Sequence, residues 1–217
     1  MSNLVHLESQ FNTIKNEIPT TVNLRAYRCL SWLKKAAASS DDLDMRFISL
    51  WIAFNAIYAK DLTFVESDKS AFRQFLHFIN QRAGEELYQL TWEKFPEDIR
   101  IFLNNRYVFQ PFWDFHNGHF SEAALKEDLE KEREQVKRSL EQQDSANLLV
   151  MLFNRIYTLR NQVFHGGATY NSKANRPALK NACNLLEVYT ELFLQVILDN
   201  PCEKEWGRPY YPYITEA

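Results

Sequence analysis

The stretch LDMRFISLWIAFNAIYA, residues 43–59, is the most apolar part of the chain and indicates its fold class. Its apolar side chains fall on nearly every side of a helix: Phe47, Ile48, Leu50, Trp51, Ile52, Phe54, Ile57 and Tyr58. A helix that is apolar all round belongs in the centre of a bundle. Asn55 lies within it, and because a buried amide needs hydrogen-bond partners, either a packing role or a place in a cleft suits it.

The segments on either side of this stretch also carry helical patterns. Only 5 Gly and 7 Pro occur in 217 residues, which favours long helices over strands and turns. We expect further helices over residues 4–18, 24–38, 68–83, 122–143, 146–165 and 177–199, and a short one beginning near Pro96. Residues 109–120, with Pro111, Asn117 and Gly118, are expected to form a loop that packs down. The sequence therefore predicts an all-α, up-and-down helical bundle with extra helices.

The length of the chain favours one domain. With 46% hydrophobic residues among 217, the chain can bury one substantial core, so we expect a single domain over residues 1–217. Residues 61–143 are expected to be an insertion-like helical segment of unassigned role. Residues 200–217, rich in Pro and Tyr, are expected to form an extended tail against the bundle.

Several classes of protein are disfavoured. Cys29, Cys183 and Cys202 are odd in number and far apart, unlike a zinc ribbon or a redox pair. His116 and His119 lack enough neighbouring ligands, and no Gly-rich phosphate loop occurs, so we expect neither a metal nor another cofactor. Residues 1–19 do not resemble a secretory signal, and no apolar run approaches the roughly 20 residues that span a bilayer. We therefore expect a cytoplasmic protein without a membrane partner.

Charge is distributed unevenly along the chain, whose net charge is -3. Residues 121–144 hold eight acids against five bases, whereas 145–186 hold no acid and five bases: Arg155, Arg160, Lys173, Arg176 and Lys180. A second acid-free stretch, 18–40, contains Arg25, Arg28, Lys34 and Lys35. We expect these two stretches to contribute to one phosphate-attracting surface, with Asn55 and Asn154 as weaker candidates for nucleotide or RNA binding.

The helix expected over 146–165 has two distinct faces. At about 100° per residue, one stripe faces the core: Leu149, Leu152, Ile156, Leu159 and Val163. Asn154, Asn161 and His165 fall opposite that stripe, flanked by Val150, Met151, Tyr157 and Phe164. Polar groups set in apolar surface suggest that a partner docks there. Arg160 points about 140° from His165 on an ideal helix, so it must curl, or the helix end must distort at Gly166-Gly167.

These residue types suit phosphodiester cleavage. Histidine can move a proton to or from a ribose oxygen near neutral pH, and an arginine can neutralise the charge that develops on phosphorus. An ordinary helix end explains the same residues, because cations complement the negative end of a helix and Gly-Gly is a common C-terminal cap. Spacing alone favours that ordinary explanation.

The string LRNQVFHGG, residues 159–167, resembles the Arg-polar-x3-His signature of the HEPN family, and FISLWIAFNAIYA, residues 47–59, resembles an early apolar helix of its prokaryotic members. The resemblance implies a helical bundle that forms a homodimer in which two motifs share a cleft. It further implies a metal-independent endoribonuclease, of a toxin-antitoxin or phage-defence system, with RNA as substrate and an antitoxin protein as a further partner. Arg160 would bind phosphate, Asn161 would be the polar motif residue and His165 the catalytic histidine.

Two other hypotheses stay open at this point. In the first, the chain is a non-catalytic HEPN module that binds nucleotide, RNA or a protein, and Arg160 and His165 are binding residues. Alternatively it is a purely structural interaction protein, in which case both residues are dispensable.

Overall fold

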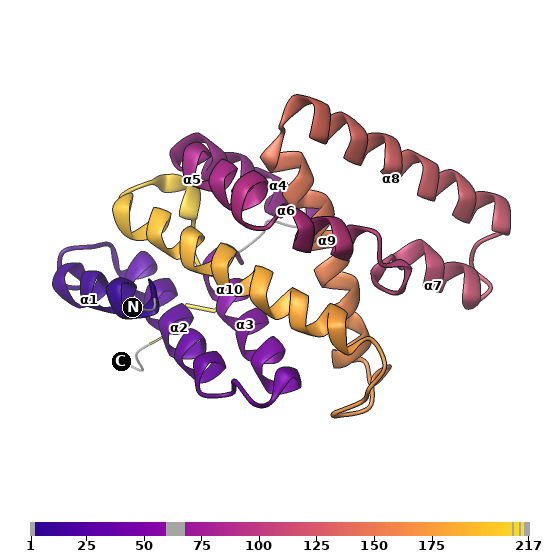
Figure 1. Cartoon of the computed structure of the whole chain (residues 1–217). Helices are drawn as coiled ribbons and strands as arrows, with labels where there is room; N and C mark the ends of the chain where they lie inside the picture. The colour runs from indigo at the N-terminus through magenta and orange to yellow at the C-terminus, as the bar shows by residue number, and fades with distance from the viewer. Residues whose placement is uncertain (1–2, 60–67, 210, 213, 215–217) are drawn as a thin grey trace. The chain divides into compact units, whose positions relative to one another are not determined.

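The computed structural model describes residues 3–59, 68–209, 211, 212 and 214, and the regular elements among them are all helical (Figure 1). The predicted all-α class is therefore confirmed. Parts of two expected segments, residues 61–67 of the insertion-like segment and 210, 213 and 215–217 of the tail, lie outside the described residues. None of the helices in that part of the chain combines the length and apolarity needed to cross a bilayer.

The chain divides into two compact units. The first comprises Met1–Ala83 and Cys183–Ala217, and the second Gly84–Ala182. The second unit thus begins later than the expected insertion-like segment 61–143 and extends beyond it to include the helix that carries the motif. The long helix α10, Arg176–Asp199, begins in the second unit and continues in the first.

The first unit is built around the apolar stretch of residues 43–59. Its helices are α1 (Asn3–Ile14), α2 (Thr20–Ala37), α3 (Leu43–Tyr58), α4 (Asp68–Arg82), most of α10, and the 3-10 turn η3 (Lys204–Trp206). The side chain of Asp42 caps α3 by accepting a 3.0 Å hydrogen bond from the Met45 amide. Phe47, Leu50 and Phe54 of α3 are at most 1% exposed, so this helix is central to the core.

Aromatic rings fix the C-terminal tail to the first unit. Phe78 of α4 meets the ring of Trp206 edge to face at 4.7 Å between centroids, and Phe75 of the same helix lies 6.3 Å from that ring. Trp206 is 4% exposed, and its indole N–H donates to the carbonyl of Asn200. The tail therefore packs against the bundle, although it contains a 3-10 turn and is not extended throughout.

The second unit contains shorter elements followed by a long helical hairpin. They are α5 (Gly84–Tyr88), the π-helix η1 (Gln89–Lys94), α6 (Pro96–Leu103), the 3-10 turn η2 (Arg106–Val108), α7 (Gln110–His116), α8 (Glu122–Gln142) and α9 (Ser145–Phe164). The expectation of a loop over 109–120 was wrong, because α7 occupies much of it. Pro111 lies in the first turn of α7, where a missing N–H costs nothing, and Gly118 follows its end at φ +78°.

The turn between α8 and α9 is defined by side-chain and backbone caps. Gln143 ends α8 in the left-handed conformation at φ 51°. The carboxylate of Asp144 then accepts 3.0 Å and 2.6 Å hydrogen bonds from the amide and side chain of Asn147. These contacts fix where α9 begins, and therefore which of its residues face the core.

Candidate functional site

Helix α9 presents the two faces that its sequence indicates. Leu149, Leu152 and Ile156 are fully buried, and Leu159 is nearly so. On the other side Asn154 and His165 are exposed, and Asn161 is half-buried. Met151, expected beside this polar line, is only 6% exposed and adds nothing to the surface there.

Arg160 curls toward the polar face, which brings it to Asn161. Its Nη1 donates a 3.0 Å hydrogen bond to Oδ1 of Asn161. The guanidinium carbon also lies 4.7 Å from the ring centroid of Phe164 and 5.7 Å from that of Tyr157, within the range of cation–π attraction. The helix need not distort to bring the arginine to this face. Arg160 Nε is buried with no hydrogen-bond acceptor among the described residues.

His165 ends α9 and lies one turn after Asn161. It is exposed, and its backbone N–H donates to the carbonyl of Asn161 at 3.0 Å. Gly166 follows at φ +73°, which L side chains rarely adopt, while a Cβ on Gly167 would lie 3.1 Å from the carbonyl oxygen of Gln162. The two glycines therefore allow the chain to leave the helix directly after the histidine. Among the described residues, the Arg160 guanidinium is hydrogen-bonded to Asn161 and not to His165.

The end of α9 is also held by a segment that sequence analysis did not assign to it. Gln162 Nε2 donates a 2.6 Å hydrogen bond to the carbonyl of Tyr107 in η2. The same carbonyl accepts a 2.8 Å hydrogen bond from the indole of Trp113 in α7. Both η2 and α7 thus help to position the motif. The aromatic composition of residues 107–115 was the only sequence signal of this role.

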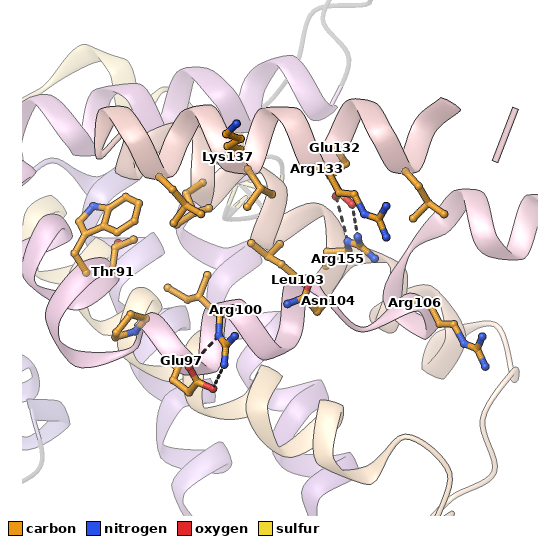
Figure 2. Close-up of a pocket in the computed structure, with 17 residues that line it drawn as sticks. Thr91, Glu97, Arg100, Leu103, Asn104, Arg106, Glu132, Arg133, Lys137 and Arg155 are labelled. Carbon is orange, nitrogen blue, oxygen red and sulfur yellow. Dashed lines mark hydrogen bonds and ion pairs between the residues drawn. The ribbon is translucent and has the colours of Figure 1, made fainter. Parts of the chain in front are cut away.

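A cavity of about 650 Å³ lies within the second unit, lined by η1, α6, α8 and α9 (Figure 2). None of residues 160–165 lines it. Sequence reasoning did not predict it, although the apolar positions Leu129, Val136 and Leu140 of α8, spaced by seven and four, gave a signal. Glu132 falls on the same stripe of α8 and also lines the cavity.

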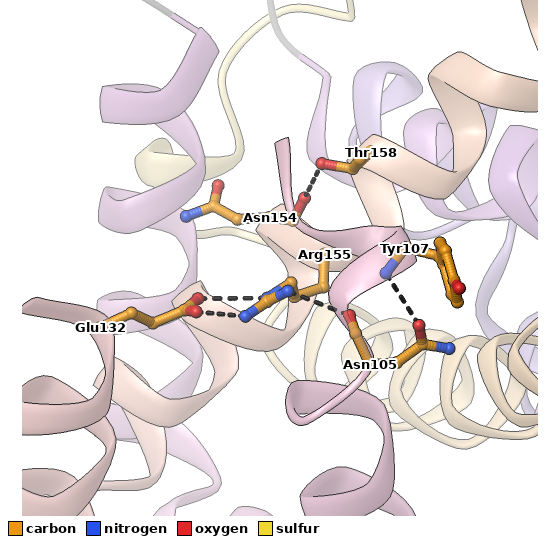
Figure 3. A network of polar contacts seen from close by, with 6 residues as sticks. All are labelled: Asn105, Tyr107, Glu132, Asn154, Arg155 and Thr158. Carbon is orange, nitrogen blue, oxygen red and sulfur yellow. Dashed lines mark hydrogen bonds and ion pairs between the residues drawn. The ribbon is translucent and has the colours of Figure 1, made fainter. Parts of the chain in front are cut away.

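Arg155 meets Glu132 at one wall of this cavity (Figure 3). The arginine side chain is 5% exposed, forms a bidentate ion pair with the carboxylate and donates a 3.1 Å hydrogen bond to the carbonyl of Asn105. Its guanidinium also lies 4.1 Å from the ring centroid of Phe109. Burial raises the pKa of Glu132 and lowers that of Arg155, in each case against the opposite effect of the ion pair.

The expected basic surface must be corrected at two positions. Arg155 is paired and buried, and Arg25, in the first unit, is 0% exposed and donates to backbone carbonyls instead of facing solvent. Arg28, in the same unit, donates to the carbonyl of Tyr211, and Asn55 is half-buried in α3.

The other basic candidates lie in the second unit with the motif. Lys173 and Lys180 are exposed, and the half-buried Arg176 donates a 2.7 Å hydrogen bond to the side chain of Asn171. Of these basic candidates, Lys173 in the loop after α9 and Lys180 in α10 are therefore the ones exposed at the surface.

Among the described residues, no three His, Cys, Asp or Glu side chains are grouped so as to hold a metal ion. No family model, curated protein or solved structure matches the chain. Any assignment of function therefore depends on the residues of α9 and on the family resemblance of their sequence.

Proposed function

We propose that the protein is a metal-independent endoribonuclease of the HEPN type that acts as a homodimer. The observation that carries the proposal is the arrangement at the end of α9, where the Arg160 guanidinium is hydrogen-bonded to Asn161, one helical turn before the exposed His165. A cation for phosphate and a proton-transfer group thus occur together on one surface. The resemblance of residues 159–167 to the HEPN signature supports the same function.

The proposed reaction uses the 2′-hydroxyl of RNA as nucleophile. As the 2′-oxygen attacks phosphorus, its proton passes to a base and the bond from phosphorus to the 5′-oxygen breaks, with that oxygen receiving a proton. The products are a 2′,3′-cyclic phosphate and a 5′-hydroxyl. His165 supplies proton transfer, the Arg160 guanidinium neutralises the charge that builds on the phosphoryl oxygens, and Asn161 holds Arg160 in place.

A second copy of the chain is proposed to complete the cleft. Tyr157 and Phe164 are 40% and 42% exposed beside the polar groups, which is the composition of a docking surface. A two-fold contact through this face would place one motif against the other, because the same patch meets itself in such a dimer. One histidine could then act as base and the other as acid. A role as a cytoplasmic toxin or phage-defence effector, restrained by an antitoxin protein, follows from the resemblance.

Incubation of the purified chain with single-stranded RNA in EDTA tests this function. We expect cleavage that leaves cyclic phosphate ends and falls by about 10²–10⁴-fold in His165→Ala. His119→Ala, which removes another exposed histidine, is the matched control and should retain full activity. Cleavage that requires a divalent metal, or that survives His165→Ala, would overturn the proposal.

A binding function without turnover is favoured by one observation. The Arg160 guanidinium lies beside two exposed aromatic rings, a combination that can receive a base and a phosphate together. In that case RNA should remain intact in the same assay, and Arg160→Ala should weaken its equilibrium binding. If Arg160 and His165 are both dispensable for cleavage and for binding, the helix end is purely structural.

A further inference from the structure

The cavity of the second unit has an apolar end and a cationic end. Because α8 and α9 run antiparallel from the turn at residues 143–144, Leu140 and Leu148 line the cavity near that turn. Glu132, Arg133 and Arg155 line it about two helical turns further along. Figure 2 shows Thr91 at one end of the lining and Arg106 and Arg133 at the other, with Glu97, Arg100 and Lys137 between them.

The lining is aliphatic more than aromatic. Six aliphatic side chains contribute to it: Ile99, Leu103, Leu129, Val136, Leu140 and Leu148. Trp92 is the one aromatic residue among those that line it, and its indole N–H already donates to Ser145. Bases and nucleosides are bound by stacking between aromatic faces, which this cavity does not offer. Its walls instead suit an alkyl chain, and its volume of about 650 Å³ lies within the range of small-molecule sites.

The charged residues around the cavity favour an anion. Five cationic side chains line it against two carboxylates, and each carboxylate is paired with one of these cations, Glu132 with Arg155 and Glu97 with Arg100, which leaves Arg106, Arg133 and Lys137. Arg133 and Lys137 reach Glu130 and Glu141 outside the cavity at 3.3 Å and 3.9 Å, but these side chains are 63% to 77% exposed. Such exposed pairs are weak, so a ligand carboxylate can replace them.

We propose that this cavity binds an amphipathic anion of the class of medium-chain fatty acid carboxylates. The alkyl chain lies against the apolar positions of α6 and α8, and the carboxylate lies at the end where Arg106 and Arg133 are found. The site shares no residue with the Arg160 to His165 motif, and the proposal does not rest on the ribonuclease function.

Calorimetric titration of the full chain with dodecanoate, below its micellar concentration, tests the proposal. We expect one dodecanoate bound per protein chain. Butyrate, which keeps the carboxylate without the long alkyl chain, and dodecyltrimethylammonium, which keeps the alkyl chain without the carboxylate, should both bind much more weakly. Val136→Trp fills the cavity and should abolish binding, whereas Leu125→Trp, on α8 outside the lining, should not. Leu129→Phe is the smaller filling variant if Val136→Trp loses its helical circular dichroism.

The cationic end is tested separately. Joint replacement of Arg106 and Arg133 by Ala should weaken dodecanoate binding on the order of tenfold, while Arg138→Ala, an exposed cation of α8 outside the cavity, should leave it unchanged. Equal binding of dodecyltrimethylammonium, or dodecanoate binding that survives both cavity-filling variants, would overturn the proposal. A third result would also overturn it: the parent chain binds no dodecanoate, and the cavity-filling variants change their oligomeric state. The cavity would then be part of an interface between copies of the chain.

Discussion

Replacement of Arg25 by Met should destabilise the first unit more than any other single truncation of an arginine there. Arg25 is 0% exposed, and its guanidinium donates 3.1 Å and 2.6 Å hydrogen bonds to the carbonyls of Ile57 and Ala59 at the end of α3. It also donates 2.9 Å and 3.0 Å hydrogen bonds to the carbonyls of Trp206 and Arg208 in the tail. Burial, and then the nearby Arg28, lower its pKa to about 10, a measure of how far the cation is removed from water.

The magnitude follows from these contacts. Each hydrogen bond to a charged group contributes about 1.5–3 kcal/mol to stability. The cost of removing the guanidinium from water offsets part of the total contribution of the four hydrogen bonds named above. Methionine fills a similar volume but leaves the carbonyls of two separate segments without a donor, so we expect a loss of about 3–5 kcal/mol in the free energy of unfolding. Because native domains are stable by only about 5–15 kcal/mol, such a loss is easily measured.

Urea unfolding followed by tryptophan fluorescence and by circular dichroism measures the effect, since Trp206 is 4% exposed beside the arginine contact. Arg28→Ala is the matched control, because Arg28 lies one turn later on α2 and donates one exposed hydrogen bond to the tail at Tyr211. It should cost less than about 1 kcal/mol. A loss below about 1 kcal/mol for Arg25→Met would refute the reasoning that these carbonyls depend on the buried cation.

Three further predictions concern the described residues. Burial first, and then Glu187, raise the pKa of Glu191 to about 7, while a hydrogen bond from Asn3 opposes the shift. Between about pH 4.5 and pH 7 the folded state therefore holds a proton that the unfolded state has lost, so the free energy of unfolding falls as the pH rises through this range. Glu191→Gln should remove this pH dependence and stabilise the chain at pH 8 by about 1–2 kcal/mol after allowance for solvent screening. Urea titrations of both proteins at about pH 4.5 and at pH 8 measure the effect. Arg155→Met should lower the free energy of unfolding by about 3 kcal/mol, because it leaves the carboxylate of Glu132 unpaired. The double variant Arg155→Met/Glu132→Leu should regain most of this stability, and equal losses in the single and the double variant would contradict an origin in the ion pair. Gly166→Ala and Gly118→Ala, both at positive φ with open space around the added Cβ, should each lower stability by about 1 kcal/mol in thermal unfolding, and a neutral result would exclude backbone strain at the end of α9.

Periodicity predicted most of the helical frame. The ends of α3, α8 and α9 fall within a residue or two of the expected limits, because each is marked by a capping side chain or by glycine. Helix α7 was missed because Pro111 and Gly118 indicate breaks, and a pattern of breaks does not say whether a short helix lies between them. The boundary of the two units at Gly84 was also not predictable, since it depends on tertiary contacts and not on local pattern.

The candidate site was predictable in its face but not in its contacts. Helical geometry places Asn161 and His165 together, yet whether Arg160 curls depends on the rings of Tyr157 and Phe164 and on the amide of Asn161. Charge counting failed at Arg25 and Arg155 because it ignores burial. Arg25 falls between Val22, Ala26 and Cys29 on the buried stripe of α2, so the pattern of α2 did contain a warning.

The arrangement of the first unit has a consequence for synthesis. Arg25 donates a hydrogen bond to the carbonyl of Trp206, which lies 181 residues later in the chain. All of the second unit is translated between these two residues. At about 5–20 residues per second, the ribosome needs about 10–40 s to bring these partners into existence. Throughout that interval the apolar surface of α3 lacks α10, and Arg25 has only its acceptors at the end of α3, the carbonyls of Ile57 and Ala59. Nascent chains of this protein should therefore depend on chaperones until α10 emerges, and the Arg25 contact should close later still, once the tail that carries Trp206 has been translated.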